Sequence, residues 1–126
     1  MNPSQLSVLM LAGGFGALAR YGLALGVQRL VGTEFPLGTL AINLLGCFLF
    51  GLIWMLAEDR IIISGETRFL LLTGFMGAFT TFSTFAFETS DLIARAHYVA
   101  AFGNVASHNL GGIFAVMLGM AVGRWF

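Results

Sequence analysis

Residues 71–88 read LLTGFMGAFTTFSTFAFE, and this stretch decides how the third hydrophobic segment of the chain folds. Gly74 and Gly77 weaken a helix, and hydroxyl residues follow at positions 80, 81, 83 and 84. Such hydroxyls compete with the helix for backbone hydrogen bonds. The stretch lies in the middle of an apolar segment long enough to cross a membrane. It therefore predicts a helix that is broken at mid-membrane, and the alternative is a continuous helix bent by its hydroxyls.

The composition around this stretch predicts an all-α integral membrane protein. Of the 126 residues, 58% are hydrophobic and only 10% are charged, whereas soluble domains average about 25% charged residues. A membrane-spanning helix uses roughly 20 residues. We predict one four-helix transmembrane domain over residues 1–126, with spans at about 6–31, 37–57, 69–96 and 98–125. No soluble catalytic domain fits beside them, so we do not expect an enzyme.

The charged residues indicate where the loops lie. If both termini are cytoplasmic, that side carries Arg60, Arg68 and Arg124, and the opposite side carries Arg29 and Arg95. Arginine in loops sets the orientation of a membrane protein, and this distribution is almost balanced. It predicts a chain that inserts in both directions and pairs with its inverted copy. The net charge is zero, which argues against nucleic-acid binding because that needs clustered basic residues.

Several polar residues fall inside the predicted spans. Asn43 lies in the middle of the second span, where its amide must find partners, either across helices or in a polar pore. Both roles stay open for it. In the fourth span Asn104 and His108 are four residues apart and share one stripe. This stripe predicts a polar track, although His108 could instead simply donate to a neighbouring carbonyl.

A broken membrane helix often uses its freed carbonyls to hold a cation. Beyond the predicted break, Phe82 and Phe85 are three residues apart and share a helix face. Aromatic rings have a positive edge, so a narrow path lined by ring edges would suit a small anion. Ordinary core packing is the alternative for both rings.

Two charges lie deepest in the spans, Arg20 and Glu88. Intramembrane charges usually pair or serve function, although Arg20 is far enough along its helix to reach the opposite interface. The single cysteine, Cys47, lies in an apolar run and is interpreted as a small packing residue.

Three motifs carry a resemblance to a known family. They are Gly13-Gly14-x-Gly16-Ala17-x-x-Arg20-Tyr21, Gly38-Thr39-Leu40-x-x-Asn43-x-x-Gly46 and Thr73-Gly74-Phe75-x-Gly77-x-x-Thr80-Thr81-Phe82-Ser83-Thr84-Phe85. In this order and spacing they resemble the Fluc/CrcB fluoride channel family. The match covers the first three spans, and the fourth is looser. The family's usual second glycine after Gly77 is Ala78 here.

The resemblance implies a fluoride-selective channel that exports toxic fluoride passively across the cell inner (plasma) membrane. It implies an antiparallel, dual-topology homodimer in the bilayer, with two fluoride pathways and a central structural sodium ion. By motif position Asn43 corresponds to the pore asparagine, and Phe82 and Phe85 to pore phenylalanines that different subunits contribute to each pathway. Gly77 and Thr80 correspond to residues whose backbone carbonyls hold sodium. The pathway side chains expected in this sequence are Asn43, Thr81, Phe82, Ser83, Phe85, Asn104 and His108. No role is assigned to Arg20 or Glu88.

Two other functions compete with this interpretation. A small dual-topology proton-coupled exporter would need a carboxylate deep in its first helix, but the first span has no Asp or Glu before Glu34. A non-transporting membrane assembly protein would use its glycines and polar residues only to pack helices, as at Gly22 with Gly26 and Gly119 with Gly123.

Overall fold

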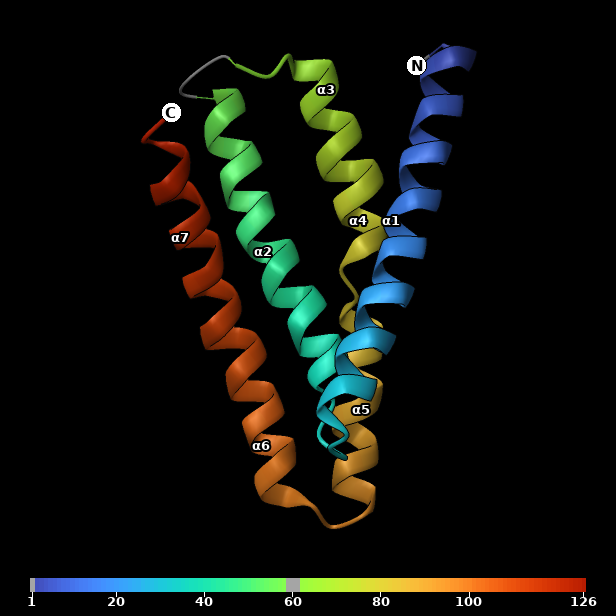
Figure 1. Ribbon diagram of the computed structural model, residues 1–126, viewed down its shortest axis with the longest axis vertical. Helices are drawn as coiled ribbons and strands as arrows, with labels where there is room; N and C mark the ends of the chain where they lie inside the picture. The colour runs from blue at the N-terminus through green and yellow to red at the C-terminus, as the bar shows by residue number, and fades with distance from the viewer. Residues whose placement is uncertain (1, 59–61) are drawn as a thin grey trace.

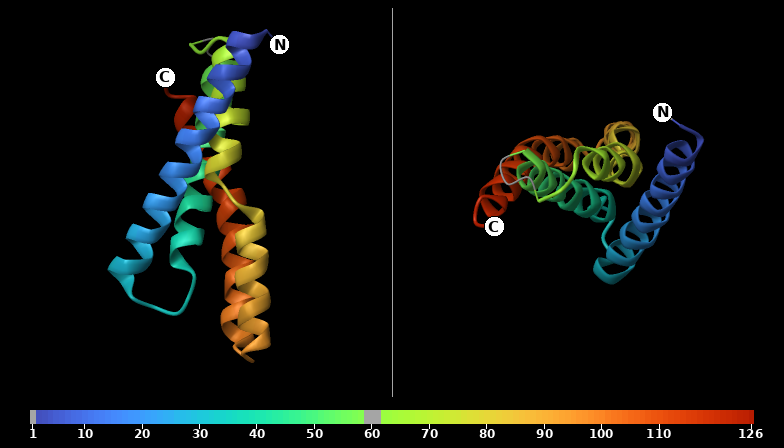
Figure 2. Two further views of the ribbon diagram at one scale, coloured as in Figure 1. Left: turned by 90° about the vertical axis from the view of Figure 1, so that its right-hand side faces the viewer. Right: turned by 90° about the horizontal axis from the view of Figure 1, so that it is seen from above.

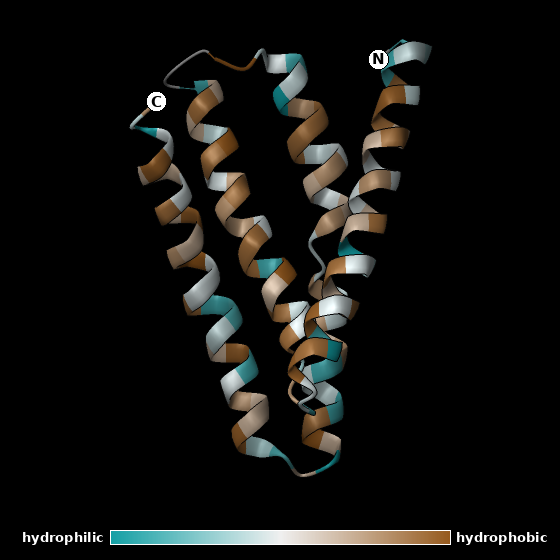
Figure 3. Ribbon diagram, in the orientation of Figure 1, coloured by the Kyte–Doolittle hydropathy of each residue, from teal (hydrophilic) through white to brown (hydrophobic). Residues whose placement is uncertain are grey.

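The computed structural model describes residues 2–58 and 62–126, and this part of the chain is helical, with no strand. Within it, four helical segments are long and apolar enough to cross a membrane: Pro3–Val31, Leu37–Glu58, Gly65–Ala94 and Tyr98–Gly123. The prediction of four hydrophobic helices is therefore confirmed. Hydrophobic residues cover most of their length (Figure 3). Many of the large ones are exposed, as the side of a chain that meets lipid must be.

The first two segments are single helices, α1 (Pro3–Val31) and α2 (Leu37–Glu58). The third consists of α3 (Gly65–Phe69), a π-helical stretch η1 (Leu70–Met76), α4 (Gly77–Phe79) and α5 (Phe82–Ala94). The fourth consists of α6 (Tyr98–Ala106), a π-helical stretch η2 (Ser107–Gly111) and α7 (Gly112–Gly123).

The turn between α1 and α2 is fixed by caps and by one side chain. Gly32 ends α1 in the left-handed conformation, with φ of 64°, which glycine adopts without a steric penalty. The Gln28 amide then donates to the Thr33 carbonyl at 2.6 Å and accepts from the Gly38 amide at 3.0 Å. Gln28 thereby satisfies backbone groups at the start of α2 that the helix itself leaves unpaired.

Helices α2 and α7 pack with their backbones close together. A Cβ on Gly51 would overlap with the Val116 carbonyl, and a Cβ on Gly119 would overlap with the Phe48 carbonyl. The predicted packing role is thus seen within the chain for Gly119, and Gly123 likewise packs against Met55. Gly22 and Gly26 differ, because a Cβ on either would meet no atom of residues 2–58 and 62–126 within 4 Å. Their face of α1 is unpacked within one chain.

The third segment changes its neighbour along its length. Its first half, η1 and α4, packs against α1, and its second half, α5, packs against α6. Figure 2 shows the two halves displaced from one another where the chain passes from α4 to α5. A buried cluster of Ile42, Leu72, Met76 and Phe79 holds the first half against α2.

Both termini lie at the same end of the molecule as the α2–α3 connection, and the α1–α2 and α5–α6 turns lie at the other (Figure 1). Arg68 and Arg124 are therefore at one end, and Arg29 and Arg95 are at the other. This agrees with the two sides of the membrane to which the sequence assigned these four arginines. Arg68 pairs with Glu58, and its guanidinium lies 5.0 Å from the centre of the Trp54 ring. Asp59 and Arg60, which mark the expected end of the second span, lie outside the described residues.

Candidate functional site

The backbone leaves the helical conformation between α4 and α5. Thr80 has φ −81° and ψ 156°, and Thr81 has φ −148° and ψ 109°, so both residues are extended. Their hydroxyls bind the adjoining helices: Thr80 Oγ1 donates to the Met76 carbonyl at 3.0 Å, and Thr81 Oγ1 caps α5 by accepting from the Thr84 amide at 3.3 Å. These are the local hydrogen bonds by which hydroxyl side chains compete with a helix.

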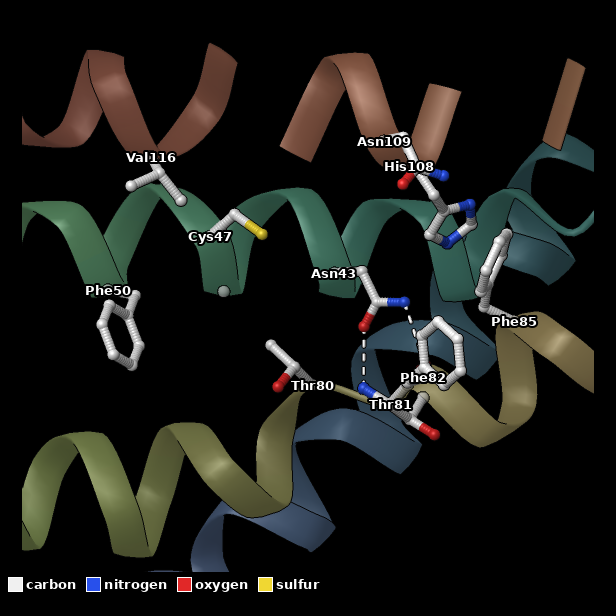
Figure 4. A pocket seen from close by; sticks show the side chains of 11 residues that line it. Asn43, Cys47, Phe50, Thr80, Thr81, Phe82, Phe85, His108, Asn109 and Val116 are labelled. Carbon is white, nitrogen blue, oxygen red and sulfur yellow. Dashed lines mark hydrogen bonds between the residues drawn. The ribbon is translucent and has the colours of Figure 1, made fainter. Parts of the chain in front are cut away.

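The Asn43 amide from α2 binds the extended backbone at two points. Its Nδ2 donates to the Thr81 carbonyl at 3.1 Å, and its Oδ1 accepts from the Thr81 amide at 2.8 Å (Figure 4). Asn43 therefore pairs with Thr81 much as a neighbouring β-strand would, and it satisfies two backbone groups away from water. One hydrogen of Nδ2 is used in this pairing, and the second has no acceptor within the described part of the chain, so it is left for another acceptor.

A pocket of about 300 Å³ opens beside this pairing. The second, third and fourth segments supply its lining, which consists of Asn43, Gly46, Cys47, Phe50, Thr80, Thr81, Phe82, Phe85, His108, Asn109 and Val116. Figure 4 shows these side chains converging on one space from three elements. The lining is mostly apolar, with a few polar groups near Asn43, and ligand pockets are commonly built this way.

Two of the expected aromatic residues meet in the pocket, but they are placed differently. The rings of Phe82 and Phe85 are 5.5 Å apart between centroids and tilted by 57°. Phe85 is 8% exposed and contacts His108, with ring centroids 4.4 Å apart, whereas Phe82 is 79% exposed. Phe85 is therefore buried within the chain, and Phe82 faces outward from it.

The fourth segment contributes His108 to the pocket but not Asn104. Asn104 is fully buried, and its Nδ2 donates to Thr89 Oγ1 at 3.0 Å, so it joins α6 to α5. His108 Nδ1 lies 3.0 Å from the Asn104 carbonyl. This contact corresponds to the alternative given for the stripe, in which His108 donates to a neighbouring carbonyl. The same ring nevertheless lines the pocket. The predicted stripe is thus split between a helix–helix contact and the pocket.

The other candidate residues do not line this pocket. Ser83 is exposed, with Oγ 3.3 Å from Thr81 Oγ1, and Gly77 is exposed on α4. Arg20 lines a separate pocket together with Thr81 and Thr84. Glu88 accepts a hydrogen bond from Thr39 Oγ1 at 2.6 Å through Oε1, and its Oε2 is buried with no partner among the described residues.

Sequence reasoning missed part of the α2 wall. Gly46, Cys47 and Phe50 line the pocket, although Cys47 was interpreted as a packing residue. The signal was present in their spacing, because positions 43, 46, 47 and 50 follow the i, i+3, i+4, i+7 pattern of one helix face. Once Asn43 is placed at a pathway, this pattern identifies its neighbours.

The fold and this site define a class: a multi-pass membrane protein with a small polar and aromatic pocket at a non-helical point of its third segment. The family model described as CrcB-like protein, Camphor Resistance (CrcB), matches residues 7–120. The chain belongs to the CrcB-like family. Its four apolar helices and this family make it a multi-pass protein of the plasma membrane.

Curated relatives of the chain carry a name for their activity. A "Fluoride-specific ion channel FluC" of Nitrosococcus oceani is 50% identical over 120 residues, which cover 95% of this chain and 96% of the relative. Proteins of the same name from Solidesulfovibrio magneticus and Chloroflexus aurantiacus are 47% and 39% identical, over 95% and 98% of this chain and 96% and 98% of the relatives, respectively.

Proposed function

We propose that this protein is a fluoride-selective ion channel and not an enzyme. The observation that carries the proposal is the Asn43 amide beside the phenylalanine rings in one pocket. The chain is also 50% identical in sequence over 120 residues to a protein named as a fluoride-specific ion channel. Fluoride is small and strongly hydrated, and moving an isolated ion into an apolar medium costs on the order of tens of kcal/mol. A pathway must therefore replace the water with other favourable contacts.

The pocket offers two such contacts. The second hydrogen of Asn43 Nδ2 is a donor that an anion can accept from, and the ring edges of Phe82 and Phe85 carry partial positive charge. Neither group is a full positive charge, so the anion is stabilised without being held tightly. An ion must leave as readily as it enters if it is to be conducted.

Passive conduction is sufficient for export. An inside-negative potential drives an anion outward with about 2.3 kcal/mol per elementary charge for each 100 mV. HF crosses membranes as a neutral acid and dissociates inside, so a channel that passes only the anion lets the trapped fluoride leave. No carboxylate for proton exchange is present in α1, whose residues include neither Asp nor Glu.

The functional unit in this proposal is an antiparallel homodimer. Ser83 and Thr84 are exposed, Phe82 is 79% exposed, and the extended backbone lies beside them in the middle of a membrane-spanning segment. Non-helical backbone and hydroxyls at that depth must be covered by protein or line a wet cavity. A second copy supplies this cover, and the open glycine face of α1 at Gly22 and Gly26 allows close helix packing. The near balance of loop arginines supports an inverted copy.

A structural sodium ion belongs to the same proposal, held by the backbone carbonyls of Gly77 and Thr80 from both copies. The chain's own hydrogen bonds support the fit. The Thr81 amide donates to Asn43 and so does not continue the helical ladder to the Gly77 carbonyl. Carbonyl oxygens at a broken helix are suitable ligands for Na⁺. The bound ion would supply positive charge near the pathway and would tie the two copies together.

Fluoride efflux from liposomes tests the function directly. Vesicles loaded with fluoride and holding purified protein, without a proton gradient, should release fluoride when a membrane potential is applied, and empty vesicles should not. A proton-coupled exporter would need the gradient, and an assembly protein would give no efflux under either condition. Either of these results would overturn the channel proposal.

The inverted dimer makes a prediction for the loop arginines. Arg29→Gln with Arg95→Gln should fix one orientation, and Arg68→Gln with Arg124→Gln and Thr33→Arg should fix the other. Each form alone should fail to protect fluoride-sensitive cells, and co-expression of the two should restore resistance. The loss of single surface ion pairs costs at most about 1 kcal/mol, so both forms should fold. Full resistance from one fixed form would contradict the inverted dimer.

The two rings can be separated from ordinary packing. Phe82→Ile and Phe85→Ile keep apolar bulk but remove the positive ring edge, and we expect flux per folded protein to fall about tenfold, equivalent to about 1.4 kcal/mol. Stability should fall by less than about 1.5 kcal/mol, since the change conserves most of the volume. Phe87→Ile is the matched control, because Phe87 is 72% exposed on the same helix and does not line the pocket. If stability falls while flux holds, the rings are packing residues.

A further inference from the structure

The hydrogen bond of His108 Nδ1 fixes the tautomer of the neutral ring, and the tautomer determines whether Nε2 is a donor or an acceptor. Its Nδ1 lies 3.0 Å from the Asn104 carbonyl. A carbonyl can only accept, so Nδ1 carries the hydrogen. In the neutral ring Nε2 then has a lone pair and no hydrogen. Within the described part of the chain Nε2 is buried and has no hydrogen-bond partner.

The ring is held firmly in this orientation. Asn104, which supplies the carbonyl, is fully buried and anchored to Thr89 on α5. The Phe85 ring lies against His108 with a centroid separation of 4.4 Å, so the ring is held between the two helices. Figure 4 shows His108 projecting from the fourth segment toward Phe82 and Phe85, on the side of the pocket where Asn43 donates to Thr81. The neutral ring therefore presents an acceptor where the pathway needs a donor.

Protonation reverses this property. The imidazolium has a hydrogen on both nitrogens, so Nε2 becomes a charged donor that can bind an anion, and charge-assisted hydrogen bonds are about twice as strong as neutral ones. The adjacent Phe85 ring also favours a cation over its face. The charged ring would need a counterion, because burial of an unpaired charge is unfavourable.

The surroundings of His108 provide no fixed counterion in the described residues. The other titratable side chain that lines the pocket is Cys47, on α2. On α5, Glu88 binds Thr39 and lines a different pocket, and Asp91 pairs with Arg95 at 3.0 Å. The sequence of α7 has no titratable residue, and that of α6 has only Tyr98, which is 65% exposed and is the first residue of that helix. Within one copy no described carboxylate is paired with His108, so an anion in the pocket can serve as the counterion of the protonated ring.

We propose that His108 is a proton-dependent anion-binding residue of this pathway, which takes up a proton and a fluoride ion together. The inference rests on the proposed fluoride conduction. It makes the protein bind and conduct fluoride better as the pH falls, which is when more HF enters a cell. Linkage makes the effect reciprocal: if a proton favours fluoride, then fluoride favours the proton by the same free energy.

NMR titration tests the linkage with a control in the same molecule. The chain has two histidines, and His97 is exposed in the turn between α5 and α6. With ¹⁵N-labelled histidine in reconstituted wild-type protein, the ring signals are followed over the range about pH 5 to 8, which brackets ordinary histidine titration. Sodium fluoride should make His108 protonate at higher pH than sodium gluconate does, and His97 should be unaffected. An equal response of both residues, or none from His108, would overturn the proposal.

Current measurements connect the linkage to conduction, because neutral HF carries no current. Wild-type fluoride current should rise as the pH is lowered through this range, and it should remain pH-dependent in His97→Gln. His108→Gln, which always has a side-chain donor, should conduct without that pH dependence. If His108→Gln keeps the full pH dependence, His108 is not the proton site. Wild-type protein that passes no fluoride current at any pH would instead overturn the proposed function.

Discussion

Asn43→Ala should abolish most fluoride flux, with a loss of at least about tenfold per folded protein, equivalent to about 1.4 kcal/mol or more. The substitution removes the pathway donor and also the two bonds to Thr81, at 2.8 and 3.1 Å. Each buried backbone group that loses its partner costs about 1–3 kcal/mol, so the thermal stability should also fall. Efflux and melting temperature must therefore be measured on the same preparations.

Asn43→Asp changes the donor of the amide and keeps its acceptor. An aspartate can still accept from the Thr81 amide, but it cannot donate to the Thr81 carbonyl while ionised, and it places a negative charge beside an anion pathway. We expect flux at least as low as in Asn43→Ala, and a loss of stability at least as large, because a carboxylate oxygen would face the Thr81 carbonyl where Nδ2 now donates, and an unpaired buried charge is unfavourable. Ser90→Ala is the control, because its hydroxyl bonds only to the Ala86 carbonyl on an exposed face. Normal efflux from folded Asn43→Asp would remove Asn43 from the pathway.

The two roles of Asn43 also show what the sequence could predict. The mid-span position of the amide required a partner, and it left structural support and pore lining equally open. The structure shows the amide bound to Thr81 and also lining the pocket. That result depends on how α2 is rotated and how far it lies from the third segment. Neither quantity is encoded in the local pattern around position 43.

The lengths of the apolar segments and the charged residues between them predicted the fold more completely than the site. Four apolar segments separated by short polar turns leave few alternatives for a chain of this composition. The ends of the helices differ by a few residues: α1 begins at Pro3, where Asn2 and Gln5 form a capping box, and not near Leu6. The hydroxyl run predicted unusual backbone near Thr80, because its cause is local.

The pocket itself depends on contacts between segments, and local rules describe these poorly. Phe82 and Phe85 are close on one helix, as their spacing predicts, yet their exposed fractions within the chain are 79% and 8%. The difference arises because α6 and η2 cover one side of α5. Asn104 was expected in the pathway because it is four residues from His108 and shares its helix face. In the structure, α5 lies close enough for Thr89 to accept a hydrogen bond from the Asn104 amide instead.

Gly46→Ala should also greatly reduce fluoride flux, because the added methyl group would clash beside the extended backbone. A Cβ on Gly46 would overlap with Cγ2 of Thr80, whose side chain is held by its bond to the Met76 carbonyl at 3.0 Å. Such overpacking typically costs about 1–3 kcal/mol. Thr80 must move, and the carbonyls around it would move with it. We expect flux to fall by about tenfold or more, where tenfold corresponds to about 1.4 kcal/mol.

A compensating substitution makes this test specific. Thr80→Ser removes the Cγ2 methyl but keeps the hydroxyl that binds the Met76 carbonyl, so it should be tolerated alone. In the double variant the serine leaves room for the alanine, and efflux and melting temperature should return most of the way to wild type. Gly112→Ala is the matched control, because its Cβ would lie 3.5 Å from Cys47 Sγ, an ordinary contact. If the double variant is as impaired as Gly46→Ala alone, the contact between Gly46 and Thr80 does not set the shape of the pathway. If the double variant regains stability but not flux, the contact between Gly46 and Thr80 contributes to packing and not to conduction.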